Sequence, residues 1–240
     1  MGIAAEELLR DAIAQFGPAF AVVTSFQMEG MVLVDMAARI SPSVRVLTID
    51  TGRLHQATLE MVAIVERRYG IHIERICPDP AEISAMMGTF RPDLFRDGIA
   101  ERMLCCQIRK VRPLEIALKN VRAWASGLRR EQAESRRDIP AVEEVDGKLR
   151  LHPLAEWTRA QVEDYTTRNN VPLHPLYAQG YATIGCEPCT RAILTGEDQR
   201  AGRWWWEADA QKECGIHFSA DGKAERTVDI LLDQVLSAAK

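Results

Sequence analysis

The stretch Phe20-Ala21-Val22-Val23-Thr24-Ser25 is a short apolar run that is rich in β-branched residues. It is followed by Gln27, Glu29 and Gly30, and then by an apolar segment over residues 31–40. A short β-branched run, a polar loop and a longer apolar segment are typical of a strand, a loop and a helix. The sequence therefore predicts a strand–loop–helix unit at this position.

The same pattern recurs along the sequence. We predict further strands over residues 44–49, 71–76, 121–126 and 148–152, and a helix over residues 54–69. Alternating strands and helices of these lengths predict an α/β fold with an open, mostly parallel sheet and helices on both faces. Ligands of such folds bind beyond the carboxyl ends of the strands, so we expect the functional residues in the loops that follow strands.

The C-terminal third has a different character. A helix is expected over residues 158–169, capped by Thr158, and residues 180–215 are irregular and rich in Gly, Arg, Trp and Cys. Apolar residues then return at helical spacing from Val228, which predicts a terminal amphipathic helix. We therefore divide the chain into an α/β domain over residues 1–203 and a C-terminal segment over residues 204–240.

Composition narrows the class of protein. The 240 residues contain no long apolar run and no charged leader at Met1, so we expect a cytoplasmic protein without a membrane segment. The net charge of -4 argues against a general nucleic-acid binder. Between Glu101 and Arg137, however, ten Lys and Arg residues stand against four Glu. That local excess suits a small polyanionic substrate.

Four of the six cysteines form two pairs. Cys186 and Cys189 make a CxxC motif, which by itself is compatible with zinc, an iron-sulfur centre or a redox dithiol. Cys105 and Cys106 are adjacent and provide a second pair of soft ligands. Tandem cysteines fit the tetrahedron of a structural zinc poorly, so the pattern favours a larger cluster.

A fifth cysteine, Cys214, lies outside these pairs in a polar, glycine-containing segment. The neighbouring Lys212 and His217 would lower the pKa of its thiol and raise the thiolate fraction at neutral pH. Cys214 is therefore the candidate nucleophile.

Six motifs together resemble a known family, the assimilatory adenosine 5′-phosphosulfate reductases of the phosphoadenosine phosphosulfate reductase superfamily. The resemblance covers nearly the whole chain. The motifs are Ser25-Phe26-Gln27-Met28-Glu29-Gly30, Asp50-Thr51-Gly52-Arg53, Cys105-Cys106-Gln107-Ile108-Arg109-Lys110, Gly127-Leu128-Arg129-Arg130-Glu131-Gln132, Gly185-Cys186-Glu187-Pro188-Cys189-Thr190-Arg191 and Glu213-Cys214-Gly215-Ile216-His217.

The resemblance implies a fold related to the ATP pyrophosphatases and a thioredoxin-dependent reduction of adenosine 5′-phosphosulfate to sulfite and AMP, for cysteine biosynthesis. It implies an S-sulfocysteine on Cys214 and, as reductant, thioredoxin or a glutaredoxin-like protein. By the same resemblance a 4Fe-4S cluster is bound by Cys105, Cys106, Cys186 and Cys189. Lys110, Arg200, Arg203 and His217 are expected at the phosphosulfate or the attacking sulfur, Ser25 beside the phosphosulfate, and Arg129 or Arg130 on the nucleotide.

Two features depart from the relatives that the resemblance names. The Ser25 loop lacks the Ser-Gly-Gly-x-Asp-Ser pattern of the ATP-cleaving enzymes, which disfavours ATP as a substrate. A terminal helix follows Cys214, and it suits either docking on the chain or the interface of a homo-oligomer.

Three alternatives stay open at this point. The first is a reductase that also accepts the 3′-phosphorylated nucleotide, although the four cluster cysteines favour the unphosphorylated one. The second is an iron-sulfur enzyme that thiolates tRNA, against which the missing ATP loop and the acidic pI of about 5.8 both count. The third is a non-enzymatic iron-sulfur sensor, for which Cys214 would be dispensable.

Overall fold

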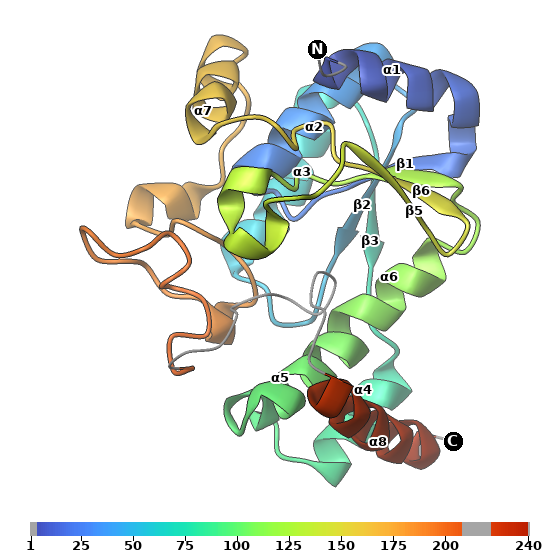
Figure 1. Ribbon diagram of the computed structural model, residues 1–240, viewed down its shortest axis with the longest axis vertical. Helices are drawn as coiled ribbons and strands as arrows, with labels where there is room; N and C mark the ends of the chain where they lie inside the picture. Colours follow the sequence, from blue (N-terminus) through green and yellow to red (C-terminus); the bar gives the residue numbers. More distant parts are fainter. Residues whose placement is uncertain (1–3, 208–221, 240) are drawn as a thin grey trace.

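The computed structural model describes residues 4–207 and 222–239. Within these ranges one six-stranded sheet runs through the molecule, in the order β3-β2-β1-β4-β6-β5 (Figure 1). The strands are β1 (Phe20–Val23), β2 (Arg45–Ile49), β3 (Ile73–Ile76), β4 (Ala123–Ala125), β5 (Val142–Val145) and β6 (Lys148–Leu151). Every pairing is parallel except that of β5 with β6. The α/β class and the mostly parallel sheet are confirmed.

Helices cover both faces of the sheet, as predicted. Side chains alternate along β1, so that Phe20 and Val22 enter the larger core while Ala21 enters the smaller one on the opposite face. The larger core lies under α1 (Ala5–Phe16), α2 (Met28–Ile40), α3 (Gln56–Tyr69) and α7 (Arg159–Arg168). The smaller core is closed by α6 (Arg112–Ala117) and the residues that follow it.

Local signals in the sequence explain where several helices begin and end. The Thr158 hydroxyl accepts a hydrogen bond from the Gln161 backbone at 3.2 Å, and the Gln161 side chain accepts one from the Thr158 backbone at 2.7 Å. This reciprocal capping box starts α7 at the predicted position. Helix α3 ends at Gly70, which has a φ of 65° that favours glycine.

Five of the described α-helices and strands were not predicted from the sequence. They are α1, α4 (Pro80–Thr89), α5 (Ile99–Cys106), α6 and β5. Helix α4 begins with the Asp79 carboxylate accepting from the Ala81 backbone at 2.8 Å, a cap that the sequence analysis overlooked. Strand β5 contains two glutamates and is largely exposed, so it lacks the apolar run by which the other strands were recognised.

A third apolar cluster joins α4, α5 and α8 (Gly222–Ala238), which pack together at one end of the molecule (Figure 1). Val235 on α8 is fully buried there, which confirms the predicted amphipathic terminal helix. Trp204, where the C-terminal segment of the sequence analysis begins, lies in the same cluster. None of the helices within residues 4–207 and 222–239 has the length and apolar character needed to cross a membrane.

Candidate functional site

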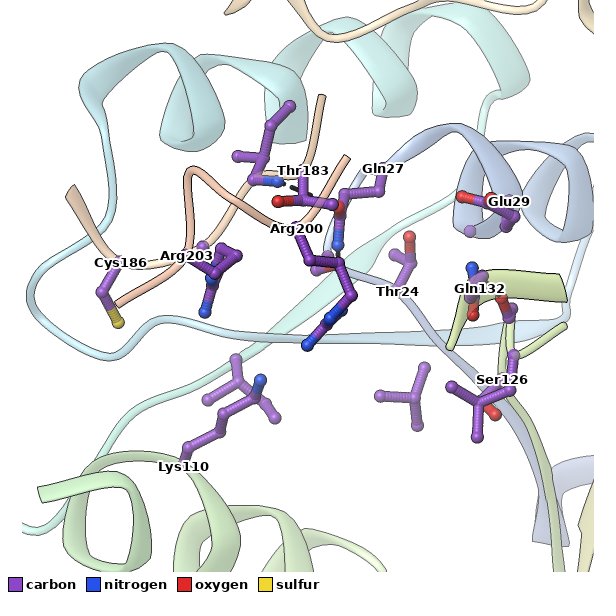
Figure 2. Close-up of a pocket in the computed structure, with 18 of the residues that line it drawn as sticks. Thr24, Gln27, Glu29, Lys110, Ser126, Gln132, Thr183, Cys186, Arg200 and Arg203 are labelled. Atoms are coloured by element: carbon purple, nitrogen blue, oxygen red, sulfur yellow. Dashed lines mark hydrogen bonds between the residues drawn. The ribbon is translucent and has the colours of Figure 1, made fainter. Parts of the chain in front are cut away.

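A cleft of about 240 Å³ opens at the carboxyl ends of the central strands (Figure 2). Its walls come from the loops after β1, β2 and β4, from the helix that carries Lys110, and from the irregular segment around Cys186 and Arg203. The predicted site residues that line it are Ser25, Cys106, Lys110, Arg129, Cys186, Cys189, Arg200 and Arg203. Residues that are far apart in sequence thus meet where parallel sheets bind their ligands.

The loop after β1 forms the back of this cleft. Thr24 accepts a hydrogen bond from the Phe26 backbone at 3.0 Å, and Phe26 has a φ of 57° in the left-handed region. Gln27 donates to the exposed Ser25 hydroxyl at 3.2 Å and accepts from the Ile184 backbone at 2.9 Å. The side-chain amide of Gln27 therefore links the irregular segment around Ile184 to the loop that holds Ser25.

Positive charge gathers at one end of the cleft. Lys110 comes from the π-helical segment Gln107–Val111, while Arg200 and Arg203 come from the irregular segment that follows Cys186, on the opposite wall (Figure 2). A Cβ at Gly185 would lie 1.7 Å from Nη1 of Arg203, so only glycine lets that guanidinium lie against the backbone. Three cationic side chains from two walls make an end that suits a dianionic group.

The two cysteine pairs border the same end. Cys105 and Cys106 end α5, and Cys186 and Cys189 flank a short 3₁₀ turn. Cys105 and Cys189 are buried in one apolar cluster, and Cys186 packs against it. The Glu187 backbone donates to the Arg53 carbonyl at 2.8 Å, which holds the CxxC turn on the loop after β2.

The electrostatic surroundings of these thiols fit a thiolate-ligated group. Burial raises the pKa of the Cys105 thiol, and the nearby Arg109 guanidinium lowers it in part. Burial raises the pKa of the Cys189 thiol to about 12, and the Arg203 guanidinium opposes this increase. The buried Nε of Arg109 and that of Arg203 have no hydrogen-bond partner among the described residues. Buried thiols beside buried cations suit a group that binds them as thiolates and carries net negative charge.

The described side chains alone do not form a metal centre. No group of three or more His, Cys, Asp or Glu residues within the described ranges is arranged so as to hold a metal ion. The ligand set Cys105, Cys106, Cys186 and Cys189 therefore stays a prediction.

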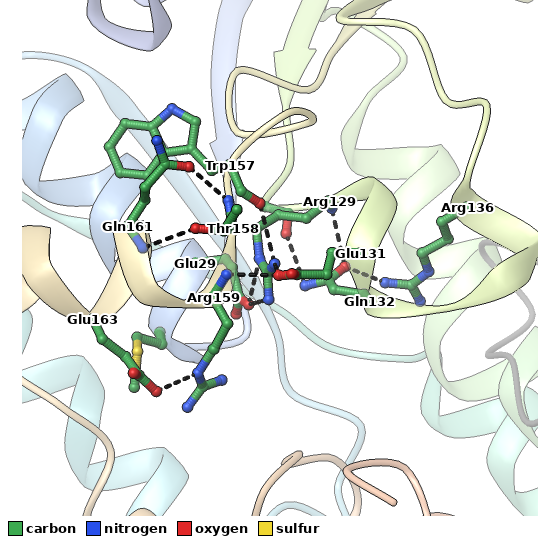
Figure 3. A network of polar contacts seen from close by, with 12 residues as sticks. Glu29, Arg129, Glu131, Gln132, Arg136, Trp157, Thr158, Arg159, Gln161 and Glu163 are labelled. Carbon is green, nitrogen blue, oxygen red and sulfur yellow. Dashed lines mark hydrogen bonds and ion pairs between the residues drawn. The ribbon is translucent and has the colours of Figure 1, made fainter.

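Arg129 and Arg130, which the sequence could not tell apart, occupy different environments. Arg129 is buried and lines the cleft, where its Nε and Nη2 contact Oε1 of Glu29 at 3.0 and 2.9 Å (Figure 3). Its Nη1 contacts Glu131 at 2.8 Å. Arg130 is exposed and pairs with Glu156 at 3.2 Å. Of the two, Arg129 is the residue that can face a ligand in the cleft.

Two predicted catalytic residues, Cys214 and His217, lie outside the described residues. The described chain on their N-terminal side is firmly held. Glu207 forms a buried ion pair with Arg102 of α5 at 2.6 Å, and the guanidinium of Arg102 lies 4.4 Å from the ring centroid of Trp204. The Trp204 side chain therefore has a packing role next to the cleft.

Several polar residues that line the cleft were not predicted as site residues. They are Thr24, Gln27, Glu29, Ser126, Gln132 and Arg159. For all of them except Arg159, which begins α7, the available signal was their position in the segments that follow β1 and β4, because loops after parallel strands form the binding site. Gln27, Glu29 and Gln132 belong to segments that the sequence singled out, but no role was predicted for them.

The fold and the cleft define an α/β protein with a cleft at the carboxyl ends of its strands that is lined by cationic side chains and bordered by four cysteines. Residues 19–192 match the family model described as the phosphoadenosine phosphosulfate reductase domain, and the chain belongs to this family.

Known relatives agree with this assignment. The adenosine 5′-phosphosulfate reductase of Allochromatium vinosum is 45% identical over 196 residues, which cover 81% of this chain and 77% of the relative. A solved structure of the phosphoadenylyl-sulfate reductase from Candida auris, a phosphate complex, is 28% identical with a TM-score of 0.66, covering 78% of this chain and 89% of that one. The yeast FAD synthetase structure, at 15% identity and a TM-score of 0.53 over 78% of this chain and 66% of that one, shares the fold alone.

Proposed function

We propose that this protein reduces adenosine 5′-phosphosulfate to sulfite and AMP in assimilatory sulfate reduction. The observation that carries the proposal is the meeting of Lys110, Arg200 and Arg203 in one cleft beside two cysteine pairs. The printed name of the Allochromatium relative supports the same substrate and reaction.

The charge distribution of the cleft suggests how the nucleotide is oriented. The phosphosulfate would lie at the end that holds Lys110, Arg200 and Arg203, near the exposed Ser25 hydroxyl and the N-terminus of α2. Backbone N–H groups at a helix N-terminus attract anions. The nucleoside would then extend toward Glu29 and Ser126, at the other side of the cleft in Figure 2.

Cys214 is the proposed nucleophile. Its thiolate attacks the sulfur of the phosphosulfate, an S–S bond forms, and the S–O bond to the phosphate breaks with both electrons leaving on AMP. Lys110 and the arginines would neutralise the charge that develops on the phosphate oxygen. We propose that His217 assists at the attacking sulfur. The product on the enzyme is an S-sulfocysteine.

A dithiol reductant completes the reaction. One thiolate of thioredoxin, or of a glutaredoxin-like protein, attacks the Cys214 sulfur and displaces sulfite, and the second thiolate resolves the mixed disulfide. The dithiol supplies the two electrons and Cys214 returns to the thiol. This chemistry suits the reducing cytoplasm, which is the predicted location.

Cys105, Cys106, Cys186 and Cys189 are the residues that would hold the 4Fe-4S cluster. When bound, the cluster would supply a fixed local charge next to Lys110, four residues after Cys106. Our proposal assigns the cluster an electrostatic role, and the bond-making and bond-breaking to Cys214 and the cationic residues.

The nucleophile can be tested with a substrate that carries radioactive sulfur. Without reductant, the wild-type protein should retain covalent label after denaturation, and the Cys214→Ser variant should retain none. Cys77→Ser is the matched control, because Cys77 is exposed beyond the end of β3 and outside the cleft. Equal labelling of wild type and Cys214→Ser would refute the assignment.

The cluster is tested separately by elemental analysis of the anaerobically purified protein. We expect four iron and four sulfide per chain in the wild type, a marked loss in Cys105→Ser, and no loss in Cys77→Ser. Stoichiometric zinc without iron in the wild type would refute the cluster.

The 3′-phosphorylated nucleotide is the second candidate substrate, since the similar Candida auris structure is named for that compound. Comparing kcat/KM for the two nucleotides decides between them. A ratio well above one in favour of adenosine 5′-phosphosulfate is expected.

A further inference from the structure

Three polar residues form a hydrogen-bonded chain that ends in the cleft and has no role in the reaction described above. Ser126 Oγ lies 3.0 Å from Nδ1 of His152, and Nε2 of His152 lies 3.0 Å from Oε1 of Glu143. The sheet order explains the alignment, because Ser126 follows β4, His152 follows β6, Glu143 belongs to β5, and these strands are neighbours. Ser126 lines the cleft, whereas His152 is completely buried.

The direction of each hydrogen bond follows from the chemistry of the groups. Arg150 lies 3.5 Å from the Glu143 carboxylate, and an ionised carboxylate can only accept. Nε2 of His152 must therefore carry the proton and donate to Glu143. Burial lowers the pKa of His152, so the ring is neutral at pH 7 and its Nδ1 is an acceptor.

The protonation state of His152 determines the direction of the Ser126 hydroxyl. Because Nδ1 of His152 accepts, the Ser126 hydroxyl must donate its proton away from the cleft. What Ser126 offers to a ligand is therefore a pair of oxygen lone pairs. A serine without such a partner can rotate its hydroxyl to donate or accept, but Ser126 is held as an acceptor.

We propose that Ser126 is a specificity-determining residue that accepts a hydrogen bond from the nucleoside half of the nucleotide, and that His152 and Glu143 are positioning residues that fix its polarity. The proposal rests on the proposed function, which assigns the phosphosulfate to the end of the cleft with Lys110 and Arg203. Ser126 lies away from those cations, on the side of Glu29 and Gln132 (Figure 2).

The substrate offers three donors of the required kind. They are the adenine amino group and the 2′- and 3′-hydroxyl groups of the ribose. A nucleotide without the donor that Ser126 recognises would leave the Ser126 lone pairs unpaired in a partly buried site, which costs binding free energy. Fixing the hydroxyl prevents Ser126 from turning to accommodate the wrong ligand.

The experiment compares four nucleotides: adenosine 5′-phosphosulfate and its hypoxanthine, 2′-deoxy and 3′-deoxy analogues. Sulfite release gives kcat/KM for each with the wild type, Ser126→Ala, His152→Leu and His152→Asn. We expect the wild type to discriminate against one analogue by about three- to tenfold, an effect typical of one neutral hydrogen bond. The analogue with the reduced kcat/KM identifies the group that donates a hydrogen bond to Ser126.

The variants separate this role from general destabilisation. For each analogue, the discrimination ratio is kcat/KM for adenosine 5′-phosphosulfate divided by kcat/KM for that analogue. Ser126→Ala and His152→Leu should bring the ratio of the disfavoured analogue close to one, mainly through KM. The ratios of the other two analogues should not change. His152→Asn should restore the discrimination in part, because an amide oxygen can still accept from Ser126. If His152→Leu does not fold, Ser126→Ala and Glu143→Gln test the same ratio.

Two outcomes overturn the inference. Wild-type protein that uses all four nucleotides equally would exclude a specific donor, and a uniform loss across the four in Ser126→Ala would indicate a purely structural role. Failure of the wild type to reduce adenosine 5′-phosphosulfate is a different result, since it refutes the proposed function itself.

Discussion

Arg129 and Glu29 stand a hundred positions apart in the sequence, and their guanidinium and carboxylate meet at 2.9 Å inside the protein. The contact joins the loop after β4 to the first turn of α2. The backbone around it is tightly packed, since a Cβ at Gly127 would lie 2.8 Å from the Cβ of Glu29. The ion pair therefore fixes the wall of the cleft on which the nucleoside would lie (Figure 3).

Replacing Arg129 by alanine should destabilise the fold. The substitution leaves the Glu29 carboxylate buried without its partner, and breaking a buried pair in this way costs about 3–5 kcal/mol. The free energy of unfolding, measured by urea denaturation, should fall by that amount.

Arg130→Ala is the matched control, because this neighbouring arginine is exposed and makes its contacts, with Glu156 and the Ile139 carbonyl, at the surface. Its free energy of unfolding should change by no more than about 0.5 kcal/mol. Equal losses in the two variants would contradict the structural role given to the Arg129 pair.

Lys110→Ala should impair catalysis without removing iron. Lys110 projects into the cationic end of the cleft and is not one of the predicted cluster ligands. Loss of one group that stabilises the developing charge should lower kcat/KM by about a hundredfold. Sulfite release and iron content are measured on the same preparation. Lys119→Ala, at an exposed position, should match the wild type in both.

The lowered pKa of His174 should make the protein less stable in mild acid. Burial, followed by the nearby His55, lowers the pKa of His174 to about 4, and its Nδ1 accepts from the Leu176 backbone at 3.2 Å. The unfolded imidazole takes up a proton near pH 6.5 and the folded one only near pH 4. The unfolded state therefore binds more protons in this window, so the free energy of unfolding falls as the pH drops from 6.5 to 4.

The His174→Asn variant tests that explanation. Asparagine retains an oxygen that can accept from the Leu176 backbone, but it does not titrate. Urea midpoints measured between pH 4 and 7 should decline less steeply in the variant. If the urea midpoint falls equally steeply with pH in the two proteins, the acid sensitivity comes from other groups. His152 is one such group, because burial lowers its pKa as well.

The terminal helix should contribute to global stability. Val235 is fully buried between α8 and its neighbours α4 and α5, whereas Ile230 on the same helix is 61% exposed. Val235→Asp places a charge in the apolar cluster and should lower the free energy of unfolding by about 3 kcal/mol. Ile230→Asp should leave it nearly unchanged. An unchanged free energy of unfolding in Val235→Asp would mean that α8 does not stabilise the fold.

The sequence predicted the central sheet well because its strands are short apolar runs followed by polar loops. The first unit, built around Phe20–Val23, lies at the centre of the observed sheet. The edge strand β5 was missed because Val142 and Val145 flank two glutamates and remain exposed, so its pairing with β6 depends on tertiary context. Helices α4 and α5 are short, with 10 and 8 residues, and so carry few repeats of the helical apolar pattern.

The candidate site was only partly accessible from the sequence. The family resemblance predicted Lys110, Arg200 and Arg203 as parts of one site, and the structure brings these three to one cleft. The sequence could not separate Arg129 from Arg130, because adjacent residues differ only in which side of the loop they occupy. Nor could it link Ser126 to His152, since that contact arises from the neighbouring positions of β4 and β6.

The π-helical segment Gln107–Val111 has a consequence for the whole site. It interrupts an otherwise continuous helix from α5 to α6, begins directly after the tandem cysteines and includes Lys110. Each residue in an α-helix advances by about 100°, so one extra residue in a turn rotates all that follows. The wide turn over residues 107–109 sets the angle about the helix axis between the side chains of Cys106 and Lys110. A deletion of one residue there would preserve both side chains and yet turn the lysine away from the cleft.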